Sequence, residues 1–321
     1  MNQKKTIAAL LIMIVVGISG FVVWQQFYQP EDVNPGSVSI IDDRGKNVTL
    51  TKYPPQRIVS LVPSCTEILF ALGLGDKVVG VDETSDYPPE VLERVKAGNL
   101  TTVGKYSLIN VELVLRLEPD LILASGAKVQ GSIVESLESL GQPVVVVYPQ
   151  RLDDVFSNIL LIGKATGHME QAEAVVADLQ KRFQEVANKT RDSPNRPRVY
   201  AEYYFNGGFA SYGSESFLNE LIYMAGGVNV FTGFAGTYVT TSTEEVLKAN
   251  PEIMIIAKGK MSMLCGLTPE IIKNRSGWNE IYAVQHNQIY EIGDDLLNSK
   301  GPRLATGLLE LAKAIHPEIF S

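Results

Sequence analysis

Short apolar runs alternate with stretches of helical periodicity along most of this chain. Three runs are typical of strands buried on both faces: RIVSLV, DLILAS and PVVVVY, at residues 57–62, 120–125 and 143–148. The segment CTEILFALGLG at 65–75 places Ile68 and Leu72 on one face and ends in glycine, so it predicts a short helix. Such alternation predicts an α/β fold with a mostly parallel sheet.

A long amphipathic stretch separates two copies of this pattern. Apolar positions recur at helical spacing from Gln171 to Asn188, and two prolines at 192–197 end the stretch. The alternation restarts with RVYAEYY at 198–204. We therefore expect two similar α/β lobes joined by one long backbone helix, with a ligand cleft between them. The expected parts are an N-terminal lobe at 37–165, the helix at 166–192 and a C-terminal lobe at 193–321.

The two halves share an internal repeat. The stretch NVELVLRLEPDLILA, which opens on Asn110, returns as STEEVLKANPEIMII, which opens on Ser242. Asparagine and serine are natural helix N-caps, so Glu112 and Glu244 each take the second helical position, 132 residues apart (244 − 112). For either glutamate alone, attraction to the helix dipole, worth about 0.3–1 kcal/mol, is a sufficient explanation. A matched pair favours a docking surface for a two-fold partner with basic sockets.

A tyrosine precedes each repeated glutamate by six residues, at Tyr106 and Tyr238. One such tyrosine is ordinarily a core or surface aromatic residue. Two at matching positions indicate the facing walls of a cleft that suits a large, flat ligand. Phe209 and Tyr212, in the glycine-flanked segment NGGFASYG, are expected to add aromatic surface, although glycines there also fit a simple turn.

The N-terminus predicts a membrane anchor. Lys4 and Lys5 precede an apolar run from Thr6 to Trp24, whose 19 residues would span about 28 Å as a helix. The positive flank predicts that the rest of the chain is extracytoplasmic. A cleaved signal peptide is the alternative, but the run is long for a signal core. We therefore expect a single-pass anchor in the cell membrane, followed by a linker that ends at residue 36.

Composition excludes several classes of partner and site. The net charge of −8 makes a nucleic-acid partner improbable. The three histidines, at 168, 286 and 316, lack acidic or cysteine partners at ligand spacing, so no metal site is expected. Cys65 and Cys265 lie in opposite halves. A disulfide is permitted outside the cytoplasm, but nothing in the sequence places the two thiols within bonding distance, and we favour separate thiols.

Three segments together resemble the helix-backbone (class III) periplasmic binding proteins of ABC importers, which carry vitamin B12, iron-siderophores and haem. The segments are RIVSLVPSCTEILFALGLGDKVVGVDETSDYPPEV, NVELVLRLEPDLIL and GPRLATGLLELAKAIHP. The resemblance covers nearly all of residues 38–319, and the first segment is most similar to the cobalamin-binding branch. It implies that Glu112 and Glu244 dock with arginines on a dimeric permease, and that the lobes move little about their hinge.

The resemblance to the corrinoid branch also implies seven ligand contacts: Pro63, Ser64, Thr84, Tyr106, Phe209, Tyr238 and Asp295. Tyr106 and Tyr238 fall where aromatic residues sandwich the ligand, although tryptophans are expected there. Thr84 replaces a tyrosine and Leu296 replaces another aromatic residue, so the shape of the cleft stays open. No arginine cluster suited to an anionic siderophore is evident, which favours a near-neutral corrinoid.

The expected function is therefore capture of a corrinoid for an ABC importer. An iron-siderophore, haem or an oxyanion is the alternative ligand. The alternative from another class is an extracytoplasmic enzyme of the chelatase type on the same scaffold. The chain contains no G-x-S-x-G, P-loop or H-E-x-x-H motif, and His168 alone does not supply the histidine and carboxylate of a chelatase. We expect no enzymatic activity and no cofactor besides the ligand.

Overall fold

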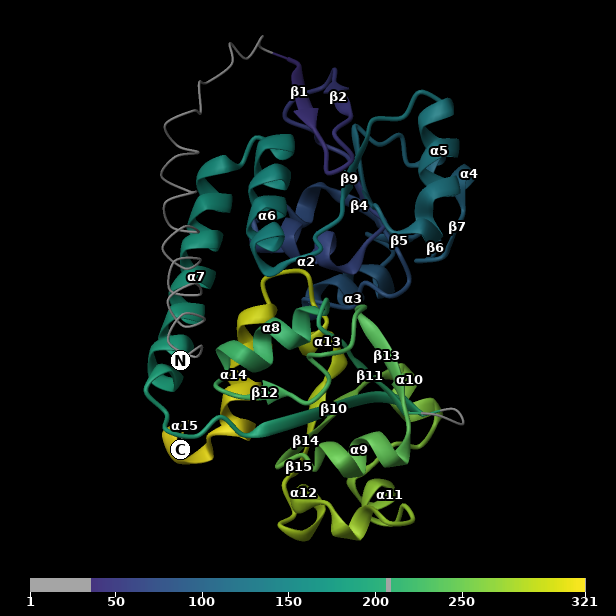
Figure 1. Cartoon of the computed structure of the whole chain (residues 1–321). Coiled ribbons are helices and arrows are strands. Elements are labelled where there is room, and N and C mark those ends of the chain that lie inside the picture. Colours follow the sequence, from purple (N-terminus) through teal and green to yellow (C-terminus); the bar gives the residue numbers. More distant parts are fainter. Residues whose placement is uncertain (1–35, 206–208, 321) are drawn as a thin grey trace.

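The computed structural model describes residues 36–205 and 209–320, and it contains two α/β lobes side by side along one long helix (Figure 1). The anchor helix expected at 6–24 lies outside the described residues. No helix within the described ranges combines the length and the apolarity that a membrane crossing requires.

The N-terminal lobe is built on a five-stranded sheet in the order β5-β4-β3-β8-β9, and all of its pairings are parallel. The strands are β3 (Ile58–Ser60), β4 (Val78–Val81), β5 (Thr101–Thr102), β8 (Leu121–Ser125) and β9 (Val144–Val147). The helices are α2 (Pro63–Ala71), α3 (Pro89–Lys96), α4 (Val111–Arg116) and α5 (Gly131–Ser139), with 3-10 turns η1 (Gly75–Lys77) and η2 (Lys128–Gln130). Two antiparallel hairpins flank the sheet: β1 (Val38–Ile41) with β2 (Asn47–Leu50), and β6 (Gly104–Lys105) with β7 (Leu108–Ile109).

The C-terminal lobe holds a mixed six-stranded sheet in the order β13-β11-β10-β14-β15, and β12 also pairs with β10. The strands are β10 (Arg198–Phe205), β11 (Phe209–Tyr212), β12 (Val228–Asn229), β13 (Tyr238–Thr241), β14 (Ile253–Lys258) and β15 (Ile289–Gly293). The β10–β11 and β11–β13 pairings are antiparallel, whereas the others are parallel. The second lobe is thus less parallel than the first, because β11 returns directly from β10 as a hairpin.

Several short helices surround this second sheet. They are α8 (Phe217–Met224), α9 (Thr243–Ala249), α10 (Lys260–Leu264), α11 (Pro269–Lys273), α12 (Tyr282–Gln285) and α13 (Asp294–Leu297), with the 3-10 turn η3 (Trp278–Glu280). The chain then ends in α14 (Leu304–Ile315) and α15 (Pro317–Phe320).

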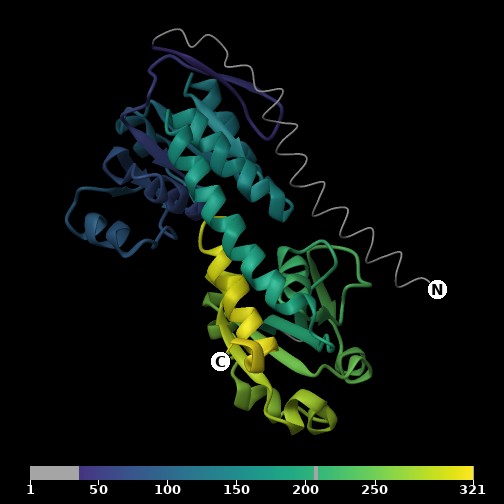
Figure 2. The same ribbon diagram turned by 90° about the vertical axis from the view of Figure 1, so that its left-hand side faces the viewer.

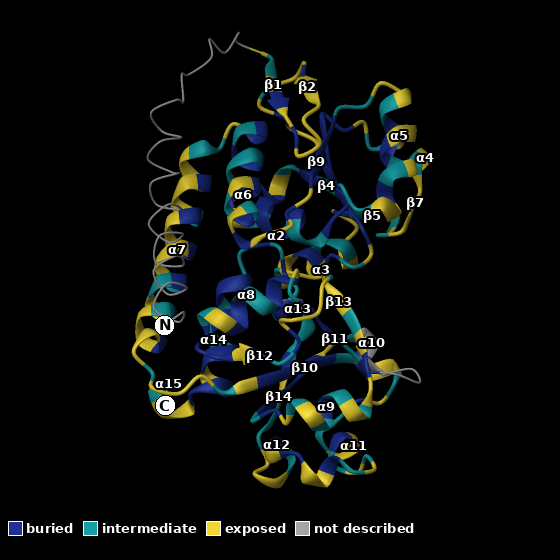
Figure 3. Ribbon diagram, in the orientation of Figure 1, coloured by how far each residue is buried: buried dark blue, intermediate teal, exposed yellow. Residues whose placement is uncertain are grey.

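The predicted backbone helix is confirmed as α7 (Met169–Arg191), which follows α6 (Leu152–Thr166) and extends along both lobes (Figure 2). Gly167 separates the two helices in the left-handed conformation, with φ of 76°, which glycine adopts without strain. The 23 residues of α7 span about 35 Å. The buried face of α7 turns toward α6 and the lobes, and exposed residues face outward (Figure 3).

One apolar cluster continues from the first lobe through α7 into the second. It includes Ile58 in β3, Val176 and Phe183 in α7, and Leu221 and Leu308 in α8 and α14, all of them buried. Each sheet also has a separate cluster on its other face. The backbone helix is therefore part of a shared core as well as a covalent connection.

The acidic residue that follows the proline of the internal repeat, Asp120 or Glu252, has a structural role in both lobes. Asp120 accepts hydrogen bonds from the backbone amides of Gln56 and Arg57, at 3.0 and 3.1 Å. Glu252 accepts one from the amide of Arg198 at 2.9 Å. Each carboxylate therefore ties the start of the central strand of its sheet, β3 or β10, to the strand beside it.

Candidate functional site

In the N-terminal lobe, the first turn of α2 and the loop after β4 form one continuous wall. Pro63 and Ser64 are the first two residues of α2 and are half-buried. Thr84 lies in the loop, where its backbone amide donates to a carboxylate oxygen of Asp82 at 2.9 Å and its hydroxyl contacts the same oxygen. Asp82 itself is fully buried.

A chain of buried hydroxyl groups connects this loop to α2. The Ser85 hydroxyl donates to Asp82 at 2.6 Å and also lies 2.9 Å from the Thr66 hydroxyl. Thr66, in α2, donates to Ser60 at the end of β3, again at 2.9 Å. Burial raises the pKa of Asp82, and the hydrogen bond from Ser85 opposes that rise. These hydrogen bonds connect the two segments that carry the predicted contacts Pro63, Ser64 and Thr84.

Gln130 fixes the third element of this wall. Its side-chain amide is fully buried and donates to the carbonyl oxygens of Leu61 and Tyr106, at 2.8 and 2.9 Å. Its carbonyl oxygen accepts from the amide of Ser125 at 2.8 Å. Tyr106 is half-buried in the β6–β7 turn, and burial raises the pKa of its hydroxyl against the effect of a hydrogen bond with Ser125. Tyr106 is thus held beside the segment that leads from β3 into α2.

The C-terminal lobe presents three tyrosines in mutual contact. Tyr238 is 54% exposed and its ring centroid lies 4.9 Å from that of Tyr203 and 5.6 Å from that of Tyr212. Tyr203 and Tyr212 are 5.3 Å apart. The hydroxyl of buried Tyr212 accepts a hydrogen bond from the Asn298 side chain at 3.1 Å. Tyr238 is therefore an exposed aromatic surface on a fixed aromatic base.

Phe209 lies elsewhere. It is 8% exposed, and its ring packs at 4.9 Å from Trp278, with the Arg275 guanidinium 4.4 Å from the ring centroid. Phe209 is part of the cluster on the opposite face of the sheet from Tyr212. The structure connects Asp295 to the first lobe through Arg303, but it places Phe209 in the interior of the second lobe.

Asp295 and the loop that follows it connect the two lobes. Arg303, at the start of α14, forms an ion pair with Asp295 and a second one, at 2.7 Å, with Glu67 in α2. Burial raises the pKa of Glu67 and Arg303 opposes the rise, while Glu67 raises the pKa of Arg303 against the effect of burial. Arg303 keeps its charge at neutral pH, because a guanidinium group does not lose its proton in proteins.

Lys300 also lies where the two lobes meet, in the contact region that we call the seam. Its ammonium group donates to the carbonyl oxygen of Pro149 at 3.0 Å and lies 5.1 Å from the ring centroid of Phe217. Burial lowers the pKa of Lys300, and Asp154 partly compensates. Figure 1 shows this loop, in yellow between α13 and α14, where it meets α2.

The repeated glutamates are placed as the caps predict. The Asn110 side chain accepts from the amide of Leu113 at 3.0 Å, and the Ser242 hydroxyl accepts from the amide of Glu245 at 3.2 Å, so both N-caps are confirmed. Glu112 and Glu244 each take the second position of their helix and are exposed. Within the described part of the chain, neither carboxylate has an ion-pair or hydrogen-bond partner, unlike the acids at 120 and 252.

The cysteines are separate free thiols. Cys65 is fully buried in the first turn of α2, where burial and the nearby Asp82 raise its pKa. Cys265 is half-buried in the other lobe. Among residues 36–205 and 209–320, no group of three or more histidine, cysteine, aspartate or glutamate side chains is arranged to hold a metal ion.

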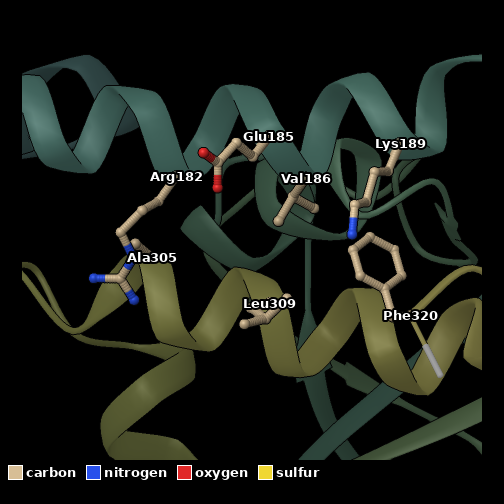
Figure 4. Close-up of a pocket in the computed structure, with 7 residues that line it drawn as sticks. All are labelled: Arg182, Glu185, Val186, Lys189, Ala305, Leu309 and Phe320. Carbon is tan, nitrogen blue, oxygen red and sulfur yellow. The ribbon is translucent and has the colours of Figure 1, made fainter.

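A small groove is lined by residues of α7 and of the C-terminal helices, and none of the predicted ligand contacts lines it (Figure 4). It has a volume of about 110 Å³ between α7 and the C-terminal helices. Its lining residues are Arg182, Glu185, Val186, Lys189, Ala305, Leu309 and Phe320. Ligand pockets usually measure about 300–1,000 Å³, so this groove does not fit a large ligand.

Sequence reasoning missed three contributors to the site. Tyr203 shares the aromatic base of Tyr238, Gln130 supports Tyr106, and Arg303 connects Asp295 to the first lobe. The strand period could have revealed Tyr203, because it lies on the same sheet face as Ala201 and opposite to Tyr200. Gln130 and Arg303 carry no sequence signal of comparable strength.

Comparison with known proteins gives a consistent result. The family described as "Periplasmic binding protein" matches residues 58–296. An uncharacterized ABC transporter substrate-binding lipoprotein of Bacillus subtilis, YvrC, is 33% identical over 288 residues, which cover 88% of this chain and 87% of the relative. The vitamin B12-binding protein of Vibrio cholerae is 31% identical over 255 residues, 78% of this chain and 86% of its own length.

Solved structures give the same picture. A possible iron-binding protein from Staphylococcus epidermidis has a TM-score of 0.71 at 30% identity, covering 82% of this chain and 99% of that one. The haem-binding protein RhuT from Roseiflexus has a TM-score of 0.73 at 26% identity, with the same coverage. The Vibrio cholerae vitamin B12-binding protein BtuF has a TM-score of 0.68 at 28% identity, covering 82% of this chain and 98% of BtuF.

Proposed function

We propose that this chain, which belongs to the periplasmic binding protein family, captures a corrinoid and delivers it to an ABC importer. The chain is an extracytoplasmic substrate-binding protein of such an importer. The tyrosines of the two lobes and the occupied cations between the lobes support a corrinoid as its ligand.

The observation that carries the proposal is the matched tyrosines at the two lobes. Tyr106 belongs to the wall around α2, and Tyr238 lies on the aromatic base of Tyr203 and Tyr212. An exposed aromatic face on a packed base is suited to a large flat ligand, because little conformational entropy is lost when the ligand binds. The similarity to vitamin B12-binding proteins, at 31% identity, supports a corrinoid in this place.

The charges near the seam favour a ligand without strong negative charge. Arg303 is occupied by two carboxylates, and Lys300 by a backbone carbonyl group and an aromatic ring. Neither cation is therefore ready to bind an anionic siderophore or a carboxylate of haem without breaking a contact between the lobes. This supports a near-neutral corrinoid over an anionic iron complex.

The proposed partner is a permease dimer. Glu112 and Glu244 are exposed at equivalent positions of the two lobes, and within the described residues neither has a partner. The acids at 120 and 252 in the same repeat bind backbone amides, which explains their presence by the fold alone. The fold needs no carboxylate at 112 and 244 in the same way, so we assign them to arginines on the permease.

The N-terminal segment completes the proposal. We propose that the apolar run at 6–24 stays attached as a single membrane span and holds the two lobes outside the cytoplasm. Fractionation of cells, followed by mass measurement of the membrane-bound chain, checks this. A mature chain that begins after residue 24 would show a cleaved signal peptide instead.

Calorimetric titration of the purified chain with cyanocobalamin, haem and a ferric siderophore tests the ligand. We expect cyanocobalamin to bind in a 1:1 ratio and more tightly than the other two. Haem or a ferric siderophore is the second candidate, favoured by the structural similarity to the haem-binding and possible iron-binding proteins. Tighter binding of either one would reject the corrinoid and keep the importer function. Chemical turnover of a bound ligand would instead favour the chelatase-type alternative.

A further inference from the structure

The seam between the lobes contains an ion pair with the geometry of a buried interior contact. Glu67, in α2 of the first lobe, has a side chain only 4% exposed, and that of Arg303 is 14% exposed. Their nearest nitrogen and oxygen atoms are 2.7 Å apart, although the residues are 236 positions apart in the chain. The ring of Tyr87, also in the first lobe, lies 4.1 Å from the guanidinium carbon of Arg303.

Arg303 is in turn fixed to the second lobe. It is the N-cap residue of the 12-residue helix α14, and it also forms an ion pair with Asp295. Gly301 shows how closely the backbones approach, because a Cβ at this position would lie 3.3 Å from a carboxylate oxygen of Glu67 and 3.4 Å from the carbonyl oxygen of Ser64. The loop therefore inserts against the first turn of α2, which is itself a predicted ligand contact.

We propose that Arg303 is a positioning residue that fixes the orientation of the two lobes through Glu67, and thereby the separation of the tyrosines at 106 and 238. A buried charge that loses its partner is strongly unfavourable, so the lobes cannot rotate apart at this seam without exposing the pair to water. The Oε2 atom of Glu67 and the Nε atom of Arg303 are buried without hydrogen-bond partners, so rotation that admits water would satisfy both. The pair therefore stabilises one orientation and leaves a hydrated, open one accessible.

The consequence for the tyrosines depends on the proposed function, but the orientation of the lobes can be measured without ligand. Spin labels on cysteines introduced at Glu135 in α5 and Lys248 in α9, both exposed, report the distance between the lobes by pulsed electron paramagnetic resonance. Cys265→Ser removes the half-buried thiol, whereas Cys65 is buried and stays unlabelled. We expect Arg303→Met and Glu67→Gln each to broaden this distance distribution and to shift its mean.

Arg275→Met is the matched control. Arg275 also binds a buried carboxylate, that of Glu202, at 2.7 Å, and its side chain is 10% exposed, but both residues lie within the second lobe. We expect this variant to lower the melting temperature and to leave the distance distribution as it is in the parent. Arg303→Lys, which keeps the charge but loses the two-sided contact, should broaden the distribution less than Arg303→Met.

An unchanged distribution in Arg303→Met, or equal broadening in Arg275→Met, would overturn the assignment. So would additive effects in the Arg303→Met, Glu67→Gln double variant, since two residues that act through one contact should show less than the sum. Far-ultraviolet circular dichroism confirms that each variant is folded before the distances are compared. If the parent fails to bind cyanocobalamin, the proposed ligand is rejected and the result on lobe orientation is unaffected.

Discussion

Glu118 and Asn250 occupy equivalent positions 132 residues apart (250 − 118), and both have left-handed backbones, with φ of 46° and 40°. Each follows a helix of the repeat, α4 or α9, and each precedes a proline. Asparagine tolerates this conformation because its short side chain bonds locally, whereas glutamate does not. The two lobes thus end the repeated helix with the same geometry, but only the second has a residue that suits it.

Glu118→Gly should therefore stabilise the protein. Glycine adopts a positive φ without the steric cost of a side chain, so we expect a gain of about 1 kcal/mol in the free energy of unfolding. For a chain of this size that corresponds to about 1.5 °C in melting temperature. Glu118→Ala is the control and should give no such gain, because alanine retains the Cβ. If the two variants melt together, the backbone at 118 is not strained.

Asp120→Asn should destabilise the protein in a pH-dependent way. Burial alone would raise the pKa of Asp120, but Lys52, at 2.8 Å, and the backbone amides of Gln56 and Arg57 hold it below its usual value. A carboxylate whose pKa is lowered by folding stabilises the native state above its ordinary pKa of 3.8 and loses that contribution as the pH falls. We expect a loss of about 1.5–3 kcal/mol at pH 7, the range for hydrogen bonds to a charged group.

Thermal unfolding of both proteins between pH 3 and pH 7 tests this sign. The difference in melting temperature should narrow as the pH falls below the ordinary pKa of aspartate, because the unfolded chain then takes up a proton at this carboxyl group that the native state, with its lowered pKa, takes up only at a lower pH. A difference that is constant over this range would mean that Asp120 acts through packing rather than through its charge.

Glu112→Arg combined with Glu244→Arg should abolish ligand uptake without changing ligand affinity. The two carboxylates are exposed, and the expected cost to stability is the loss of their attraction to the helix dipoles, about 0.3–1 kcal/mol each. Uptake by cells and calorimetry with cyanocobalamin measure the two properties separately. Glu90→Arg with Glu270→Arg is the matched control, because these are also exposed first-turn glutamates, one on each lobe. Loss of uptake in the control, or of affinity in the test pair, would contradict the docking assignment.

Tyr238→Ala should weaken corrinoid binding at least about tenfold, equivalent to about 1.4 kcal/mol, since aromatic anchors dominate binding surfaces. Tyr238→Phe should retain most of the affinity, because the ring supplies the contact. Tyr223→Ala is the control: Tyr223 is 40% exposed in α8 and has its ring against Arg196, 4.5 Å away. Calorimetry on the three variants checks the order. Equal affinity of Tyr238→Ala and the parent would remove Tyr238 from the ligand site.

The repeat was the most informative part of the sequence. It predicted both N-caps and the exposed glutamates, and helical spacing separately predicted the long helix between the lobes, because these features depend on local pattern. For Phe209, the alternation of side chains along a strand predicts the burial better than the family resemblance does. Phe209 and Tyr212 are three residues apart in β11, and side chains alternate along a strand, so they must face opposite sides of the sheet. Tyr212 joins the tyrosine base and Phe209 joins the interior.

Contacts between distant segments were beyond sequence reasoning. Arg303 and Glu67 look like ordinary charged residues in the chain, and only the fold brings α14 to α2. The antiparallel return of β11 was also missed, because the glycine-flanked segment NGGFASYG was interpreted as a loop. Pairing of charges and order of strands are set by tertiary packing, which leaves no periodic signal in one sequence.

The apolar cluster that passes through α7 has a consequence for how this molecule melts. Val176 and Phe183 belong to a single cluster with apolar residues of both halves, so loss of the interior of one half removes part of the packing of the other. Two sheets joined by a bare linker would unfold in two separate steps. Here heat should produce one cooperative calorimetric peak, and the molecule behaves thermodynamically as a single unit despite its bilobal shape.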